Sequence, residues 1–170
     1  RGIAVDRVVD APKFLVDFNG TVYFSGARSS PLTGDELFKV TGTTSVDIAM
    51  DINPGNPRSS PDKFTVVDTN LFFRANNGTA TNLWRTFSGG TQKVSDPIGV
   101  TVPSNSSFAS IGNTLYFVGT SAGLTGIFTS DGTTITSLPL TFGMIPAQLT
   151  NVGGQLYFVG TKAGIGREIW

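Results

Sequence analysis

Oxygen-bearing side chains recur at short intervals in one segment of the chain, at Asp47, Asp51 and Asn53, just before Gly55. Carboxylate and amide oxygens beside a turn are the ligands that Ca²⁺ prefers in proteins. We therefore name Asp47, Asp51 and Asn53 as a candidate calcium site. The full spacing of a calcium loop with its terminal Glu is missing, so an Asx turn at the end of a strand is the simpler interpretation of the same residues.

A second set of residues has the chemistry of a sugar-binding site. An aromatic platform with Asn and Asp side chains nearby is represented by Trp84, Asn82 and Asp131. Asp131 also opens the triplet Asp131-Gly132-Thr133, which resembles the hairpin of sialidase-type Asp boxes, where the Asp side chain caps backbone amides. That resemblance implies a structural role for Asp131 rather than a catalytic one.

Catalytic chemistry has few candidates, because the 170 residues include no His and no Cys. This chain therefore offers no imidazole base, no thiolate nucleophile and no ordinary zinc or haem ligands. Paired carboxylates are the remaining route to hydrolysis, and Glu36 and Glu168 are acids at equivalent positions of an internal repeat described below. Asn82 and Gly126 hold that position in the other copies, so the repeat explains the acids without catalysis. The sequence predicts no catalytic residue, no cofactor and a protein that is not an enzyme.

The charges balance overall but are unevenly distributed. Twelve Lys and Arg residues offset twelve Asp and Glu residues, which leaves no basic surface for nucleic acid, and no apolar run reaches the roughly 18 residues of a membrane span. Between residues 97 and 161 the only charged residue is Asp131. Interface cores avoid charged side chains, so we predict that residues 97–161 contact a protein partner or a second copy. A neutral exterior covered by Ser and Thr is the alternative.

Two short patterns recur four times along the chain. The first is an apolar residue, an aromatic residue and Phe, with its last residue at Phe24, Phe73, Phe117 and Phe158. The second ends on an aromatic residue 11 to 14 positions later, at Phe38, Trp84, Phe128 and Trp170. Two patterns that drift in step indicate repeated units of about 45 residues. We predict that both sets of aromatic side chains are buried at equivalent positions.

Each unit has the pattern of four short strands joined by turns. Residues such as Asn19-Gly20 before the first pattern and Asp131-Gly132 after the second supply the positive φ of tight hairpins. A four-stranded antiparallel unit that repeats every 40 to 50 residues or so is typical of a β-propeller blade. The predicted fold is therefore all-β, nearly without helix, and a β-propeller; an open array or a two-sheet sandwich is the alternative. The predicted segments are an outer strand at 1–10 that closes the last blade, followed by blades at 11–56, 57–104, 105–145 and 146–170.

The two ends of the chain suggest a closed ring of four blades. Residues 5–10 match residues 46–51, the outer strand of the first complete unit, at both Asp positions. The last unit reaches only its third strand at Trp170. We therefore predict that residues 3–9 pair with residues 166–170 in one sheet. The alternative is a longer array in which other blades complete a larger ring.

The second pattern resembles the bacterial ELWxxDGT repeat family, whose consensus is Glu-Leu-Trp, two variable residues and Asp-Gly-Thr. The matching segments are Glu36-Leu37-Phe38, Asn82-Leu83-Trp84, residues 127–133 and Glu168-Ile169-Trp170. The resemblance implies a secreted, periplasmic or cell-surface bacterial protein with propeller-like architecture and no defined reaction. We expect a non-enzymatic structural or protein-interaction module of such a complex. A carbohydrate-binding propeller is the alternative, and a glycan-active hydrolase has less support.

Overall fold

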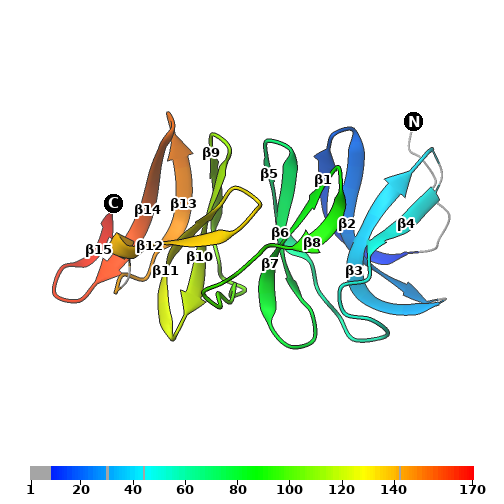
Figure 1. Ribbon diagram of the computed structural model, residues 1–170, viewed down its shortest axis with the longest axis horizontal. Coiled ribbons are helices and arrows are strands. Elements are labelled where there is room, and N and C mark those ends of the chain that lie inside the picture. The colour runs from blue at the N-terminus through cyan, green and yellow to red at the C-terminus, as the bar shows by residue number, and fades with distance from the viewer. Residues whose placement is uncertain (1–8, 30, 44, 142) are drawn as a thin grey trace. The chain divides into compact units, whose positions relative to one another are not determined.

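The computed structural model describes residues 9–29, 31–43, 45–141 and 143–170. The structure is all-β, with four antiparallel sheets, three of four strands and one of three (Figure 1). Within each sheet the strands follow one another in chain order, so neighbouring strands are joined by hairpins. Among the described residues the one helical element is a short 3-10 turn at Pro139–Thr141. The prediction of an all-β fold built from repeated antiparallel sheets is confirmed.

The strands have the following bounds. The first sheet contains β1 (Asp10–Phe18), β2 (Thr21–Ser29), β3 (Leu32–Thr41) and β4 (Ser45–Met50). The second contains β5 (Asp62–Val67), β6 (Asn70–Asn76), β7 (Thr81–Phe87) and β8 (Gly90–Lys93). The third contains β9 (Phe108–Ile111), β10 (Thr114–Ser121), β11 (Leu124–Ser130) and β12 (Ile135–Leu138). The fourth contains β13 (Ala147–Val152), β14 (Gln155–Lys162) and β15 (Gly166–Ile169).

The first hairpin turn of every sheet begins with a residue of positive φ. The residue five positions before the Phe of the first pattern has a φ between 50° and 59° in all four copies. These residues are Asn19, Asp68, Gly112 and Gly153. Gly, Asn and Asp adopt this left-handed region at low cost. The turns predicted at these positions are confirmed, and the repeat extends from the sequence to the backbone.

A residue of positive φ recurs in the first strand of three sheets, and in two of them it coincides with a β-bulge. Phe14 in β1, Lys63 in β5 and Gln148 in β13 have φ values of 57°, 60° and 54°, and each lies ten residues before the Phe of its first pattern. The pairing of β1 with β2 shifts between Lys13 and Val16, and the pairing of β13 with β14 shifts at the equivalent place. A bulge leaves one residue outside the ladder and redirects its side chain.

The pairing of the second and third strands has the same register at one position in the first, third and fourth sheets. Gly26 pairs with Glu36 in the first sheet, and Gly160 pairs with Glu168 in the fourth. In the third sheet Gly119 pairs with Gly126 at the same place. The equivalence of the two acids, inferred from spacing, is therefore also a structural equivalence.

The described residues pack into two compact units, one of residues up to 64 together with 73–81, the other of residues 65–72 and 82–170. In the first unit the stacked rings of Phe24 and Phe38, with centroids 5.8 Å apart, form a buried cluster with Val46. The second unit has a smaller cluster of Ala109, Val118, Ile127 and Leu149. Its main core is formed by Val67, Phe72, Leu83, Val94, Val100, Val102, Leu115, Phe117, Phe128 and Ile135.

The aromatic anchors are buried in three sheets and not in the fourth. The buried anchors are Phe24, Phe38, Phe73, Trp84, Phe117 and Phe128. Phe158 is only half-buried, and Trp170 is 39% exposed. The cause is that β15 pairs with β14 and, within the described residues, has no strand on its other side. The prediction that Trp170 is buried is therefore wrong for this structure.

The predicted pairing of residues 3–9 with β15 lies mostly outside the described residues. Of that segment the structure describes Val9, which packs against the buried cluster of the first unit. Asp10 was assigned to the predicted outer strand, but it is the first residue of β1 and pairs with Ala27. The closing pair therefore stays a prediction, with any outer strand ending before Asp10.

Candidate functional site

Glu36, one of the paired acids, is a buried carboxylate that fixes the segment between β4 and β5. Its side chain is 0% exposed. The backbone N–H of Ile52 and the hydroxyl of Ser59 donate to Oε2 at 2.8 and 2.6 Å. The backbone N–H of Ser59 donates to Oε1 at 3.0 Å. Both carboxylate oxygens therefore bind the connecting segment, and Glu36 has a structural role.

Burial raises the pKa of Glu36, although hydrogen bonds from Ser59 and Ile52 oppose the shift. The folded protein therefore holds this proton more tightly than the unfolded chain does, so stability falls as the pH rises from the ordinary value of 4.5 through the raised pKa. We predict that, from about pH 4 to about pH 7, the wild type loses free energy of unfolding relative to a Glu36→Gln variant. Urea unfolding of both proteins across this range tests the sign, and a relative gain would contradict it.

The three candidate calcium ligands have separate surroundings. Asp47 is exposed and accepts a hydrogen bond from the hydroxyl of Thr41 at 3.0 Å. The side-chain amide of Asn53 donates to the carbonyl of Arg58 at 3.4 Å, and Asp51 is half-buried. Within the described ranges no group of three or more His, Cys, Asp or Glu residues could hold a metal ion. The calcium site stays a prediction, and two of its side chains have structural partners.

The candidate sugar-binding residues do not form one surface. Trp84 and Asn82 in β7 are each only 7% exposed, whereas Asp131 is exposed. Trp84 occupies the aromatic anchor position, which faces the core in the first three sheets. In this structure its indole offers no open face to a sugar ring.

Asp131 closes its own turn. The backbone N–H of Thr133 donates to Oδ1 of Asp131 at 2.8 Å, and the hydroxyl of Thr133 donates to the same oxygen. These hydrogen bonds lower the pKa of Asp131. The carboxylate caps the turn, as expected from the Asp-box resemblance.

One surface position changes its chemistry from sheet to sheet. It is the residue that follows the aromatic anchor, together with its partner on the fourth strand. The pairs are Lys39 with Asp47, Arg85 with Gln92, and Thr129 with Thr136. The two threonine hydroxyls lie 2.7 Å apart and hydrogen-bond to each other. Charge is therefore absent from this position in the sheet that lies within the charge-poor stretch.

Large apolar side chains are also exposed along residues 97–161. They are Ile98, Leu124, Ile145, Val152 and Tyr157, with exposed fractions of 40% to 66%. A further pair of hydroxyls, those of Thr120 and Thr125, lies 3.1 Å apart. Burying apolar groups, or hydroxyls that already hydrogen-bond to each other, costs little free energy of desolvation. This stretch therefore has the composition of a surface that can be buried.

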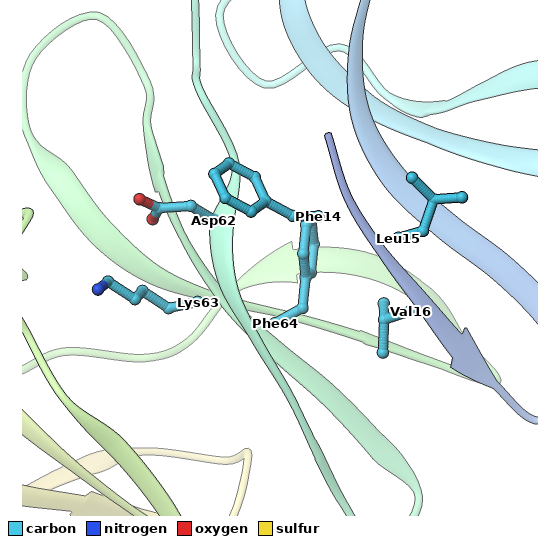
Figure 2. Close-up of a pocket in the computed structure, with 6 residues that line it drawn as sticks. All are labelled: Phe14, Leu15, Val16, Asp62, Lys63 and Phe64. Atoms are coloured by element: carbon cyan, nitrogen blue, oxygen red, sulfur yellow. The ribbon is translucent and has the colours of Figure 1, made fainter. Parts of the chain in front are cut away.

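A pocket of about 440 Å³ lies in the first unit between β1 and the start of β5, lined by residues 14–16 and 62–64 (Figure 2). Phe14 is 57% exposed and Leu15 is 66% exposed. Phe64 packs against Phe73 with ring centroids 5.5 Å apart. Sequence reasoning missed this pocket. Its one signal was the succession of Phe14 and Leu15, because regular strand alternation turns one of two consecutive side chains outward.

No known protein family, curated protein or solved structure matches the chain. The function proposed for it therefore rests on the geometry of its own residues. Among the residues that the structure describes, no helix combines the length and the apolar character needed to cross a membrane.

Proposed function

We propose that this protein is a non-enzymatic protein-interaction module and that residues 97–161 carry its contact surface. The observation that carries the proposal is the exchange of the Lys39–Asp47 pair of the first sheet for the Thr129–Thr136 pair of the third. An interface core accepts hydroxyls that bind each other, whereas unpaired charge is costly to bury. The partner is another protein or a second copy of this chain.

The state of the carboxylates supports a non-enzymatic role. Glu36 binds the segment between β4 and β5, and Asp131 caps its own turn. Asp62 forms an ion pair with Arg74, with 2.6 Å between Oδ1 and Nε. Each of these acids has a structural partner, which weakens the hydrolase alternative. The burial of Trp84 weakens the sugar-binding alternative in the same way.

The proposal includes a scaffold of propeller-like blades, of the kind implied by the ELWxxDGT resemblance, secreted or at the surface of a bacterium. Three features support repeated blades: the positive φ at the first residue of each first turn, the recurrent positive φ in the first strand, and the common register of the second and third strands in three sheets. Regular sheets of this size bury their faces only against neighbours. The repeat thus provides a rigid support, and its surface residues can vary from blade to blade.

We do not propose that this chain alone closes its four sheets into a ring. Ser59, which binds Glu36, is equivalent to Asp10, because each is held to the residue three places after the Phe of the first pattern. If the contact of Glu36 with Ser59 were repeated around a four-bladed ring, Glu168 would face Asp10. Two carboxylates in contact repel each other, whereas the hydroxyl of Ser59 donates to Glu36.

The proposal is tested by placing a charge at one position in two sheets. Thr136 and Gln92 are exposed, and both occupy the fourth-strand position opposite the residue that follows the aromatic anchor. We expect Thr136→Glu to weaken association at least about tenfold, which corresponds to about 1.4 kcal/mol. Sedimentation velocity measures self-association, and quantification of proteins that co-purify with the tagged chain measures binding to a partner.

Gln92→Glu is the matched control, because it adds the same charge opposite Arg85 and outside residues 97–161. We expect it to change association less than about twofold, with both variants within about 0.5 kcal/mol of the wild type in free energy of unfolding. Equal loss of association in both variants, or none in Thr136→Glu, would refute the assignment of the surface.

A further inference from the structure

Separately from the surface at residues 97–161, we propose that the pocket between β1 and β5 binds one large apolar side chain of a partner protein, such as Trp, Phe or Leu. Four of its six lining residues are apolar: Phe14, Leu15, Val16 and Phe64. Phe14 and Leu15 are 57% and 66% exposed, so the pocket is open to solvent. In Figure 2 the charged side chains of Asp62 and Lys63 lie on the opposite side from Leu15 and Val16.

The polar end of the pocket is already satisfied, which favours an apolar occupant. The carboxylate of Asp62 is held by both Nε and Nη2 of Arg74, at 2.6 and 3.1 Å. The two side chains are only 18% and 14% exposed. A sugar would bring several hydroxyls, and each needs a new partner when it leaves water. An apolar side chain needs none, and its burial against Phe14 is favourable.

The bulges favour insertion of a side chain over addition of a strand. β1 and β5 are edge strands of their sheets, and an edge is the usual place for a partner strand to pair. β1 carries a bulge at Phe14, which has a φ of 57°, and the equivalent residue of β5, Lys63, has a φ of 60° that also departs from extended backbone. A bulge interrupts the row of N–H and C=O groups and so disfavours continuous pairing.

The bulge itself belongs to the repeat, but the aromatic residue does not. The equivalent positions of positive φ carry Lys63 and Gln148, so the fold does not require Phe at this position. Phe64 forms a supported wall, because its ring packs against Phe73. An open pocket covers only part of a free small molecule. A side chain attached to a partner gains further contacts around the rim, and the partner's other contacts share the cost of association.

Titration with N-acetyl-tryptophanamide, a neutral mimic of a Trp residue, tests the pocket. We expect saturable changes in the amide NMR signals of residues 14–16 and 62–64. Phe14→Gln should weaken this binding at least about tenfold and keep the fold, because Gln148 occupies the equivalent bulge. Leu32→Gln is the control, because Leu32 is 58% exposed and lies outside the pocket; it should leave binding unchanged.

Methyl β-D-glucopyranoside is the second probe, and we expect no saturable change with it. Saturable binding of the glucoside without binding of N-acetyl-tryptophanamide would overturn the proposal, as would an absence of saturable changes up to the solubility limit. Equal loss of binding in Phe14→Gln and Leu32→Gln would also overturn it. The pocket lies outside residues 97–161. A negative result at the pocket therefore does not refute the contact surface at residues 97–161, and a negative result there does not refute the pocket.

Discussion

Replacing Glu36 with Ala should lower the free energy of unfolding by about 3 kcal/mol, because a buried donor left without an acceptor costs about 1 to 3 kcal/mol and the removed side chain also leaves a cavity. The substitution leaves the backbone N–H of Ile52 without its acceptor. It also removes one of the two acceptors of the Ser59 backbone N–H and hydroxyl, which both still reach the carbonyl of Asp35 at 3.0 and 2.8 Å. Ile52 and Ser59 are 4% and 1% exposed, so water cannot readily replace the carboxylate. Urea unfolding followed by circular dichroism measures the change.

Glu168→Ala is the matched control for this prediction. Glu168 occupies the same register position as Glu36 but is exposed. We expect its replacement to change the free energy of unfolding by less than about 0.5 kcal/mol. Similar losses in the two variants would show that burial and the bonds to Ser59 do not explain the role of Glu36.

The second large effect is expected at the aromatic core of the third sheet. Phe117 is 0% exposed, and its ring lies 5.8 Å from that of Phe108 and 5.9 Å from that of Phe128 between centroids. Phe117→Ala should lower the free energy of unfolding by about 4 kcal/mol, through lost burial and the cavity that remains. Unfolding curves in urea provide the measurement.

The equivalent substitution in the fourth sheet, Phe158→Ala, should cost at most about half as much, because less apolar surface returns to water from a half-buried side chain. Phe158 is hydrogen-bonded through its backbone to Trp170, which is itself 39% exposed. An equal loss at Phe117 and Phe158 would contradict the distinction between the covered sheets and the fourth.

Several features of the fold were predictable because they depend on residue type at a fixed spacing. Asn19, Asp68 and the equivalent glycines tolerate a positive φ, and each lies five positions before the Phe that ends the first pattern. Phe24 and Phe38 repeat as a pair because a four-stranded sheet presents the same face once per unit. This spacing can be recognised even where the residues between the patterned positions differ from copy to copy.

The bulges and the surroundings of β15 were not predictable in the same way. Phe14, Lys63 and Gln148 share a backbone conformation but no side-chain chemistry, so no pattern of residue types marks them. Burial of Trp170 depends on whether another strand packs beside β15, and the residues around Trp170 do not indicate this. These features depend on pairing partners rather than on the residue itself.

Two predictions for Trp84 were incompatible with each other. Trp84 was both an aromatic anchor expected to be buried and a candidate sugar platform expected to be open; the structure agrees with the anchor. The role of Glu36 was hidden because its donors, Ile52 and Ser59, lie in an irregular segment whose path has no periodic signal. The pocket beside Phe14 was missed for the same reason, since it depends on a bulge.

Site-specific photo-cross-linking tests the central claim most directly. A benzoylphenylalanine residue is placed at Thr136, or at Gln92 as the matched position, and the tagged protein is irradiated in its native source and at high concentration after purification. The account predicts cross-links to a partner or a second copy from position 136 and none from position 92. Cross-links from position 92 with none from position 136 would contradict the claim that residues 97–161 form the contact surface.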